Sequence, residues 1–367
     1  MKQPDLLIVG AGPVGCVMAE RAAAKGLTSV IVEKRNHIAG NCYDFKEENG
    51  VLVHKYGPHY FRTNNPELID YLSRFTDWLP ANYEVKSEVG GRLFPFPINR
   101  TTLELFFDRT FTETEAHAFL DAKREHIPEI HNSEDFILSR VGRELYEAFY
   151  LGYTQKQWDM HPSQLDKSVC GRIPIRFNRD HRYVDHNFQQ LPKNGYTEMF
   201  RQMIDNELID LKLEADFFLI KEEIKPALAT IYTGPIDLYF DYQFGKLPWR
   251  SLDFEFTFHS GELVQPCVQI NHPNSHDYTR SVEIKHITQQ EHLGTVVCKE
   301  YPRAKGEPYY PIPTTSNKEL YLKYKTLAKA ETLQNKVFFT GRLAQYTYIN
   351  TDEAIEMALK LAEELFD

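Results

Sequence analysis

The chain has 367 residues, of which 42% are hydrophobic and 26% charged, and its formal net charge at pH 7 is −10. This length allows two or three domains around a sizeable core, and the composition is that of a soluble globular protein. The negative charge argues against broad binding to nucleic acid or to anionic membranes, so an anionic substrate would need a local cluster of arginines.

The cysteine and histidine patterns argue against disulfides and metal sites. The five cysteines are scattered and odd in number, without CxxC spacing, which is typical of a reducing compartment. The 14 histidines form no HExxH motif, so no metal is expected. The first apolar run begins at Leu6, which leaves no room for a signal peptide, and no apolar run approaches ~20 residues. We therefore expect a cytoplasmic protein without a membrane span.

A strand–turn–helix–strand pattern opens the chain. The apolar run at 6–9 predicts a buried strand and leads into the glycine-rich sequence GAGPVG at 10–15. An alanine-rich helical pattern follows, which Gly26 can stop, and a second apolar run ends on Glu33. A lone GxGxxG would be weak evidence, but the flanking strand, the helix and the terminal acid together predict a dinucleotide-binding unit.

Each key residue of this unit has a role in such a site. Gly10 permits the tight turn, Gly12 lets backbone N–H groups approach a pyrophosphate, and Gly15 lets the helix pack closely on the strand. The helix N-terminus faces the phosphates with its positive dipole end. Glu33 can accept hydrogen bonds from a ribose diol, which disfavours the 2′-phosphate of NADP and leaves NAD and FAD as candidates.

Polar loops and a hairpin follow the dinucleotide unit. Residues 34–41 form a polar loop at the edge of the predicted sheet where ligands bind. Residues 53–64 mix Gly-Pro with His and Arg, as is typical of a site loop. Residues 65–78 are predicted to be helical, and residues 82–97 to form a hairpin around Gly90 and Gly91.

The middle of the chain changes from helical to irregular to extended. Residues 101–158 carry apolar residues at helical spacing almost throughout, which predicts an inserted helical region. Residues 159–192 are irregular and rich in Pro and Arg, the composition of a mobile or site-lining loop. A helix at 199–205 and a strand at 229–235 follow, and the alternation at 240–300 predicts antiparallel strands.

The closing segment selects between the two cofactors. A strand with a glycine stop at 336–342 precedes an amphipathic helix at 351–366, capped by Thr351. Both ends of the chain thus contribute to the dinucleotide-binding fold, as they do in the FAD-binding oxidoreductases. This order of elements favours FAD over NAD. We predict an α/β fold with three parts: a discontinuous FAD-binding Rossmann-like domain (1–78, 193–240 and 318–367), an inserted helical domain (98–192, with a mobile substrate loop near 165–178), and an antiparallel β-sheet domain (79–97 and 241–317).

Aromatic residues and arginines are the candidates for substrate binding. The sequence FYLGYTQKQW at 149–158 offers ring faces for a base to stack on and polar groups to contact its edge, although a buried aromatic cluster explains it equally well. Arg172, Arg176 and Arg280 have tyrosines near them in the sequence and suit a diphosphate, because a guanidinium donates bidentate hydrogen bonds and phenols add more. Taken singly, a surface arginine is more often a solvated charge.

Ordered segments along the chain resemble those of a known family. They are GAGPVG with EKRNHIAGN, KYGPHYF, GYTQKQW, RIPIRF, YTGPIDLYFDYQFG, WRSL, YTR, KEYP, GEPYYP and GRLAQYTY. On these segments the chain resembles the bacterial UDP-galactopyranose mutases over nearly its whole length. The resemblance implies that reduced FAD acts through N5 as a nucleophile on the anomeric carbon and expels UDP, after which the sugar ring recloses through O4 rather than O5. The net redox change is zero, although the flavin must be reduced.

The resemblance also implies a set of site residues. FAD would be bound by Gly10, Gly12, Pro13, Gly15, Glu33, Lys34, Asn41, His59, Gly341, Arg342 and Asn350. The nucleotide sugar would be bound by Asn82, Phe149, Tyr153, Thr154, Gln157, Trp158, Tyr183, Arg250, Asn271, Tyr310, Tyr348 and Arg62. Arg172 and Arg280 would be the catalytic residues, because they would clamp the diphosphate and stabilise the departing UDP. A homodimer is implied as well.

Three places depart from the family's pattern, all near the expected sugar end. Arg62 stands where a second histidine usually follows His59, Asn350 stands where an acid usually follows Tyr348, and residues 184–190 read VDHNFQQ. An arginine in place of that histidine is a feature of the branch that also accepts UDP-N-acetylgalactosamine.

Four readings of the function therefore stay open. They are a FAD-dependent mutase for UDP-galactose, with or without activity on its N-acetylated form, a mutase for another nucleotide hexose such as a dTDP-6-deoxyhexose, a flavin oxidoreductase with the same order of elements, and a binding protein that has lost catalysis. The arginine–tyrosine clamp argues against the third, because an amine or neutral substrate would not need it. The presence of both Arg172 and Arg280 argues against the fourth.

Overall fold

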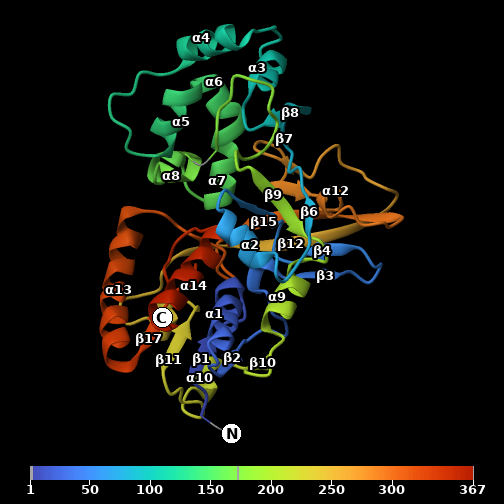
Figure 1. The fold of residues 1–367 in the computed structure, drawn as a ribbon. Helices are drawn as coiled ribbons and strands as arrows, with labels where there is room; N and C mark the ends of the chain where they lie inside the picture. The colour runs from blue at the N-terminus through green and yellow to red at the C-terminus, as the bar shows by residue number, and fades with distance from the viewer. Residues whose placement is uncertain (1–2, 172, 367) are drawn as a thin grey trace.

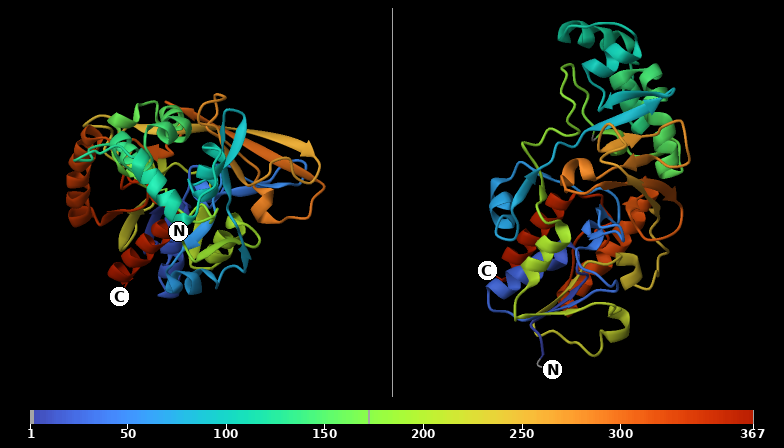
Figure 2. Two further views of the ribbon diagram at one scale, coloured as in Figure 1. Left: turned by 90° about the horizontal axis from the view of Figure 1, so that it is seen from above. Right: turned by 90° about the vertical axis from the view of Figure 1, so that its right-hand side faces the viewer.

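The computed structural model describes residues 3–171 and 173–366. A parallel β-sheet and a lobe of helices form opposite ends of the molecule, and a large, mostly antiparallel sheet lies between them (Figure 1 and the right-hand view of Figure 2). None of the helices in the described part of the chain combines the length and the apolar character needed to cross a membrane.

The parallel sheet carries the dinucleotide motif. Its strand order is β10 (Ile209–Lys212), β2 (Ser29–Val32), β1 (Leu6–Val9), β11 (Ala229–Tyr232) and β17 (Val337–Phe339). Every side chain of the central strand β1 is buried, because layers cover both faces of the sheet. Leu6 and Ile8 belong to the core under the helices, whereas Leu7 and Val9 pack with the aromatic residues Phe217 and Tyr232.

Helices that are far apart in the sequence cover this sheet. The helix α1 (Pro13–Ala24) packs against both α14 (Thr351–Phe366) and α9 (Tyr196–Ile204), and its small alanines permit the close approach. The helix α13 (Thr315–Asn335) packs beside β17 and against α11 (Ile236–Tyr239). The remaining short helices around this part are η1 (Gly40–Cys42), α2 (Pro66–Leu72) and α10 (Phe217–Ile220).

The larger sheet has seven strands and receives its strands from two parts of the sequence. The order is β16 (Tyr310–Pro311), β12 (Trp249–Ser260), β15 (Gly294–Arg303), β14 (Arg280–Val282), β13 (Gln269–Asn271), β7 (Val85–Val89) and β8 (Arg92–Phe96). β7 and β8 form the hairpin predicted around Gly90 and Gly91, and β7 pairs in parallel with β13. The short helix α12 (Lys285–Thr288) follows β14.

The helical lobe lies at the other end of the larger sheet. Its helices are α3 (Arg100–Phe106), α4 (Glu113–Lys123), α5 (Ser133–Val141), α6 (Arg143–Tyr146), the π-helical turn η2 (Glu147–Leu151), α7 (Gly152–Trp158), η3 (Pro162–Gln164) and α8 (Ser168–Gly171). Side-chain oxygens of Asn99, Thr112 and Asn132 cap three of these helices by accepting backbone N–H bonds, which explains where each helix begins. The π-helical turn joins α6 to α7, and such turns are frequent at functional sites.

Two small sheets connect the larger parts. β3 (Asp44–Lys46) pairs with β4 (Leu52–His54), and β9 (Phe188–Pro192) lies between β5 (Phe61–Thr63) and β6 (Trp78–Pro80). The second of these sheets places Arg62 opposite Gln189.

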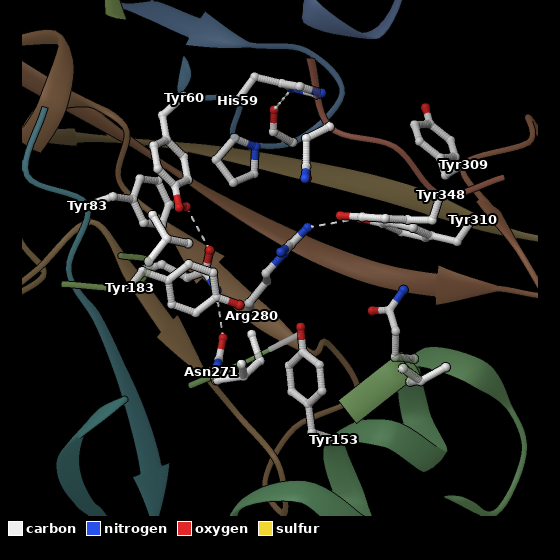
Figure 3. Close-up of a pocket in the computed structure, with 18 of the residues that line it drawn as sticks. His59, Tyr60, Tyr83, Tyr153, Tyr183, Asn271, Arg280, Tyr309, Tyr310 and Tyr348 are labelled. Atoms are coloured by element: carbon white, nitrogen blue, oxygen red, sulfur yellow. Dashed lines mark hydrogen bonds between the residues drawn. The ribbon is translucent and has the colours of Figure 1, made fainter. Parts of the chain in front are cut away.

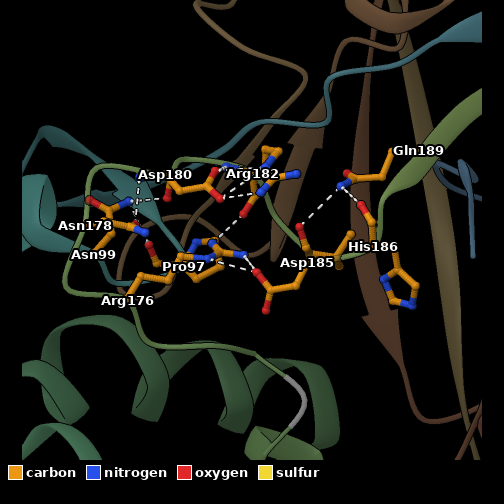
Figure 4. Close-up of polar contacts among 10 residues, drawn as sticks. Pro97, Asn99, Arg176, Asn178, Asp180, Arg182, Asp185, His186 and Gln189 are labelled. Atoms are coloured by element: carbon orange, nitrogen blue, oxygen red, sulfur yellow. Dashed lines mark hydrogen bonds and ion pairs between the residues drawn. The ribbon is translucent and has the colours of Figure 1, made fainter. Parts of the chain in front are cut away.

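The loop between α8 and β9 is anchored by an internal network around Arg176 (Figure 4). The side chain of Arg176 is 8% exposed and donates to Asp185 Oδ1 (3.1 and 2.5 Å) and to the backbone oxygen of Arg182 (2.5 Å). Its backbone N–H donates to the carbonyl of Ile98 (3.0 Å), and Asn99 Nδ2 donates to the carbonyl of Asp180 (3.4 Å). The guanidinium of Arg176 is thus engaged within the loop rather than turned toward a ligand.

The fold class predicted from the sequence is confirmed: a Rossmann-like α/β domain is combined with an antiparallel sheet. Some local predictions were too coarse. The helix expected at 65–78 ends at Leu72 and is followed by β6, the irregular segment 159–192 contains β9, and α13 was not anticipated. Strands of three to five residues acquire their identity from pairing with distant strands, which a local pattern does not contain. The exact domain boundaries stay a prediction.

Candidate active site

A first cavity, which we call the dinucleotide cleft, has a volume of about 250 Å³ and lies at the carboxyl ends of the central parallel strands. Gly10 turns the chain there with φ +102°, and a Cβ at this position would clash with Thr233 Oγ1. A Cβ on Gly15 would clash with the carbonyl oxygen of Gly10. The first turn of α1 therefore packs directly on the backbone of the Gly10 turn, and a side chain at position 15 would prevent this contact.

The wall of the cleft suits a pyrophosphate and a ribose. Gly12 precedes the first residue of α1 and lines the cleft, so the helix N-terminus faces the cavity. A Cβ on Gly40 would come within 2.9 Å of Gly12 Cα, so the two glycine backbones pack against each other and form a part of the wall without side chains, which we call the glycine cradle. Glu33 is buried and accepts hydrogen bonds from the N–H groups of Ala11 and Arg35 (both 2.9 Å), leaving further lone pairs for a diol. These features fit a dinucleotide.

Nearly all the predicted cofactor residues meet in this cleft. Gly15 packs behind the wall, and the others line it: Gly10, Gly12, Pro13, Glu33, Lys34, Asn41, His59, Gly341, Arg342 and Asn350.

The second cavity, which we call the aromatic cavity, has a volume of about 240 Å³ and is built around Arg280 (Figure 3). Its walls come from the strands β5, β8, β13, β14 and β16, from η2, α7 and α8, and from the loops at 56–60, 83, 183–184 and 348–350. Of the predicted substrate residues, the following line it: Arg62, Phe149, Tyr153, Thr154, Gln157, Trp158, Tyr183, Asn271, Tyr310 and Tyr348, together with the predicted catalytic residue Arg280.

Arg280 is held in place by a buried carboxylate. Its Nε donates to Glu300 Oε2 (2.7 Å), and one terminal nitrogen donates to the hydroxyl of Tyr310 (3.2 Å). Glu300 is fully buried; burial raises the pKa of its carboxyl, and the guanidinium of Arg280 acts in the opposite direction. This pair fixes a cation at the wall of the cavity, where its charge is screened less than it would be in bulk water.

Tyrosines surround this cation. Tyr310 stacks on Tyr348 with ring centroids 5.7 Å apart, and Tyr60 stacks on Tyr83 at 4.3 Å. Burial raises the pKa of Tyr153 and Tyr310, so their hydroxyls stay protonated and remain able to donate hydrogen bonds. A fixed guanidinium among protonated phenols is a suitable environment for a phosphate-bearing anion.

The helix α7 brings the aromatic sequence to the far end of the cavity. Gly152, its first residue, allows this approach, because a Cβ there would clash with the carbonyl oxygen of Pro273. Gln157 Oε1 accepts a hydrogen bond from Thr279 Oγ1 (3.3 Å), while Gln157 Nε2 is buried and has no partner among the residues that the structure describes. An unpartnered buried amide that lines a cavity is a donor available to a ligand carbonyl, such as one on a pyrimidine edge.

The two cavities meet. Five residues line both of them: Asn41, His59, Arg342, Asn350 and Thr351. Burial lowers the pKa of His59 to about 3, so its ring is neutral there. Arg342 donates to the carbonyls of Ile349 (2.5 Å) and Tyr309 (3.4 Å) and lies over the ring of Tyr348. A ligand in the aromatic cavity would therefore contact the end of a dinucleotide bound in the cleft.

Two of the departures from the family pattern are in direct contact. Arg62 donates to the hydroxyl of Tyr60 (2.7 Å) and to Asn350 Oδ1 (2.8 Å), and Asn350 Nδ2 donates to Glu353 (2.9 Å). Within the described part of the chain, Arg62 Nε is buried without a hydrogen-bond partner. The two substitutions thus form one polar unit at the junction of the cavities.

Three predicted site residues do not join these walls. Asn82 is exposed and donates to Glu84 Oε1 (3.2 Å). Arg250 is buried behind α7, where its Nε donates to the backbone oxygen of Gln157 (2.9 Å). Arg172 lies outside the described residues. Arg250 thus supports the helix that carries Gln157, and direct roles for Asn82, Arg172 and Arg250 at the substrate stay predictions.

Sequence reasoning missed four residues that shape the cavity. Tyr60, Tyr83 and Tyr309 line it, and Glu300 holds Arg280. Tyr60, Tyr309 and Glu300 lie within the segments KYGPHYF, GEPYYP and KEYP, so the signal was present without an assigned role. Tyr83 carries no local signal, because its position next to Tyr60 depends on the pairing of distant strands.

The sequence and the fold both match known proteins. The family profile described as UDP-galactopyranose mutase matches residues 148–348, and the profile described as NAD(P)-binding Rossmann-like domain matches residues 8–75. A probable UDP-galactopyranose mutase of Klebsiella pneumoniae is 40% identical over 99% of this chain and 95% of its own length. A dTDP-fucopyranose mutase of Escherichia coli is 34% identical over 98% of this chain and 97% of its own length.

A solved structure of reduced UDP-galactopyranose mutase shares the fold with a TM-score of 0.75 at 15% identity, covering 99% of this chain and 95% of the other. At 15% identity, this structural similarity supports the fold alone. The sequence matches at 40% and 34% identity cover almost the full length and show the family. The chain therefore belongs to the UDP-galactopyranose mutase family, whose members are nucleotide-sugar pyranose/furanose mutases.

Proposed function

We propose that this enzyme interconverts UDP-galactopyranose and UDP-galactofuranose with FAD as its cofactor. The observation that carries the proposal is the pairing of the partly buried Arg280 with the fully buried Glu300, in a tyrosine-lined cavity that shares five wall residues with the dinucleotide cleft. A flavin oxidoreductase acting on an amine would have no use for a buried cation at the substrate. The 40% identical relative named as a probable UDP-galactopyranose mutase supports this choice of sugar.

The residues of the cleft fit FAD. The glycine cradle and the N-terminus of α1 would bind its pyrophosphate, Glu33 its adenosine ribose, and Asn41, His59 and Arg342 would lie at its flavin end. When bound in its reduced form, FAD would supply the nucleophile for the anomeric carbon of the sugar without net redox change.

The chain's own residues bind, orient and stabilise charge. Tyr153 offers a ring face for stacking of the base, and Gln157 Nε2 offers a donor to its edge. Arg280 and the hydroxyl of Tyr310 would stabilise the negative charge that grows on the diphosphate as the bond to the sugar breaks. Holding UDP in this clamp keeps it in position to return to the rearranged sugar, which is catalysis by positioning.

A mutase for a dTDP-linked deoxyhexose is the second candidate. It is favoured by the 34% identity to a dTDP-fucopyranose mutase and by the Arg62–Asn350 unit, which changes the hydrogen-bond donors at the junction where the sugar would lie.

Product analysis with a panel of nucleotide furanoses tests the proposal. Dithionite-reduced enzyme would be incubated separately with UDP-galactofuranose, UDP-N-acetylgalactosaminofuranose and a dTDP-6-deoxyhexofuranose, and the products would be resolved by chromatography. We expect conversion of UDP-galactofuranose to the pyranose with the highest kcat/KM. No conversion of either UDP sugar, with conversion of the dTDP sugar, would replace the proposal by the second candidate.

A further inference from the structure

A group of two histidines and a glutamate lies outside both cavities, on the surface of the larger sheet. It comprises Glu88, His272 and His276, and one ligand atom from each lies within 4.8 Å of those of the other two. The histidine spacing in the sequence does not indicate it, because Glu88 is separated from His272 by more than 180 residues. We propose that these three side chains form a binding site for a zinc-like divalent transition metal.

The fold explains how the three residues meet. β13 pairs in parallel with β7, with Asn271 opposite Ser87, so the next residues along these strands, His272 and Glu88, are brought side by side. The chain then turns through 272–279 to β14, and His276 occupies the left-handed region with φ +61°. A non-glycine residue rarely takes this conformation without a constraint, and here it returns the second imidazole to the first.

The distances suit a tetrahedral ion after small side-chain movements. His272 Nδ1 lies 2.7 Å from Glu88 Oε2, and His276 Nε2 lies 3.8 Å from the same oxygen. Bonds of about 2.0–2.1 Å to a tetrahedral zinc ion separate its ligand atoms by about 3.3 Å. The side chain of His276 is 46% exposed, so a small shift of its ring along the stacked face of Tyr278 would bring Nε2 into position, and the open side would leave a water as the fourth ligand.

The hydrogen bonds behind His272 present its Nδ1 lone pair to the site. Ser281 Oγ donates to Gln265 Oε1 (2.5 Å), so its lone pairs are left to accept from His272 Nε2–H at 3.1 Å. In this arrangement Nδ1 carries a lone pair that faces a carboxylate oxygen at 2.7 Å. Two acceptors at this distance require a proton or a metal ion between them. A ligating histidine that donates its other N–H to an oxygen is the common second-shell pattern of protein metal sites.

The surrounding residues hold the loop in shape before any ion binds. The ring of Tyr278 stacks on that of His276 at 4.7 Å with an interplanar angle of 6°. The ammonium of Lys156, on α7, donates to the backbone oxygens of His272, Ser275 (2.9 Å), His276 (3.1 Å) and Tyr278 (3.2 Å). Its positive charge is offset by Glu88 and Asp277. A preorganised site loses less entropy on binding.

Nitrogen-rich ligation selects the class of metal. Two imidazoles and one carboxylate suit Zn²⁺, Ni²⁺ or Cu²⁺, whereas Mg²⁺ and Ca²⁺ prefer oxygen ligands. The loop that would be closed by the ion joins Asn271 to Arg280, and both of these line the aromatic cavity. Metal binding would therefore stabilise the folded state and stiffen the segment that carries the diphosphate clamp.

Equilibrium dialysis against Zn²⁺ tests the proposal. Untagged, chelator-treated enzyme would be dialysed at pH 7.5, and bound zinc would be measured by elemental analysis for the wild type, His276→Gln, Ser281→Ala and His131→Gln. His131→Gln is the matched control, because His131 is an exposed histidine 3.5 Å from a single glutamate, Glu129, without a second imidazole. The five cysteines are buried and do not compete for the ion.

We expect one zinc ion per chain with micromolar affinity in the wild type and in His131→Gln. His276→Gln should weaken binding at least tenfold, and Ser281→Ala by about 10–100-fold. The midpoint of thermal unfolding should rise with zinc in the wild type and not in His276→Gln. Substoichiometric binding in the wild type, or equal binding by His276→Gln, would overturn the proposal and leave a proton as the bridge between Glu88 and His272.

Discussion

The dinucleotide cleft and the aromatic cavity are of similar volume and share a wall, yet backbone atoms shape the first and side chains shape the second. The cleft is shaped by backbone: glycines at 10, 12 and 40, the N-terminus of α1 and the turn after β1. The aromatic cavity is shaped by side chains, with Arg280 from one strand, Glu300 from another and Tyr153 from the helical lobe. A backbone site is specified by a short local motif, whereas a side-chain site depends on how distant segments pair.

This contrast predicts different consequences of substitution in the two regions. A change in the aromatic cavity should remove catalysis and leave cofactor binding intact. A change in the cleft should remove the cofactor and the stability that it adds.

Arg280→Ala should give the largest effect. Removing the cation of the diphosphate clamp is expected to lower kcat by about 10³-fold or more, because charge on the departing UDP loses its fixed partner. The protein should stay yellow, with a flavin content equal to that of the wild type, as measured by its visible absorbance. Arg280→Lys is the control. Lysine keeps a positive charge that can pair with Glu300, but it lacks the planar guanidinium that donates two parallel hydrogen bonds. A colourless Arg280→Ala protein would mean that this residue serves the cleft instead.

Gly10→Ala and Gly26→Ala form a matched pair for the cleft. Both glycines have positive φ (+102° and +76°), but a Cβ at 10 would clash with Thr233 and a Cβ at 26 would meet nothing within 4 Å. Gly26→Ala should cost about 1–2 kcal/mol of unfolding free energy and retain flavin. Gly10→Ala adds the overpacking cost and should lose about 2–5 kcal/mol together with the flavin. Urea unfolding and flavin content would be measured on both, and retention of flavin by Gly10→Ala would contradict the cradle.

The junction between the two regions should be sensitive to acid. Burial lowers the pKa of His54 to about 4, and His54 Nδ1 accepts the backbone N–H of His59 at the shared wall. Since the folded-state pKa is below the unfolded value of about 6.5, the unfolded chain binds more protons between these pH values. The contribution of neutral His54 to the free energy of unfolding is thus fully present above about pH 6.5, and it is lost as the pH is lowered toward 4.

The expected loss from His54 alone is about 2.5 kcal/mol between pH 7.5 and pH 4.5. Urea unfolding at the two pH values would show it, and His54→Gln should reduce the difference by that amount. His131→Gln, at an exposed histidine, should leave the difference as it is in the wild type. An equal pH dependence in His54→Gln and in the wild type would show that this ring titrates normally.

Arg62→His should give the smallest effect. It removes the hydrogen bonds to Tyr60 and Asn350 at the junction and is expected to change the ratio of kcat/KM for the N-acetylated and plain UDP sugars by about tenfold against the former, worth about 1.4 kcal/mol. Flavin content should not change. Equal ratios before and after the substitution would remove the reason for linking Arg62 to sugar choice.

The same contrast explains what the sequence could reveal. The turn at Gly10–Gly15, the acid at Glu33 and the hairpin at Gly90 and Gly91 were predictable, because each depends on neighbouring residues. Arg280 and Gln157 were predicted through segments that resemble a family, and the structure brings both to one cavity.

Other features required the fold itself. Asn82 and Arg250 lie outside the walls of the aromatic cavity, because one side chain is exposed and the other is buried behind α7, and their roles at the substrate stay predictions. The contact between Arg62 and Asn350 joins residues 288 positions apart, and Glu88 meets His272 only through the pairing of β7 with β13. Long-range pairing of this kind leaves no local pattern in the sequence.

The central claim is that reduced flavin takes part in the reaction without net redox change. Following the oxidation state of the flavin during turnover tests this claim most directly. Anaerobic enzyme with its flavin chemically reduced would be mixed with excess UDP-galactofuranose, and the pyranose product and the oxidation state of the flavin would be followed together. We expect many turnovers per enzyme with the flavin still reduced, and no product from oxidised enzyme. Oxidation of one flavin per product, or equal conversion by oxidised enzyme, would contradict the claim and would make the enzyme an oxidoreductase or a mutase that does not use its flavin.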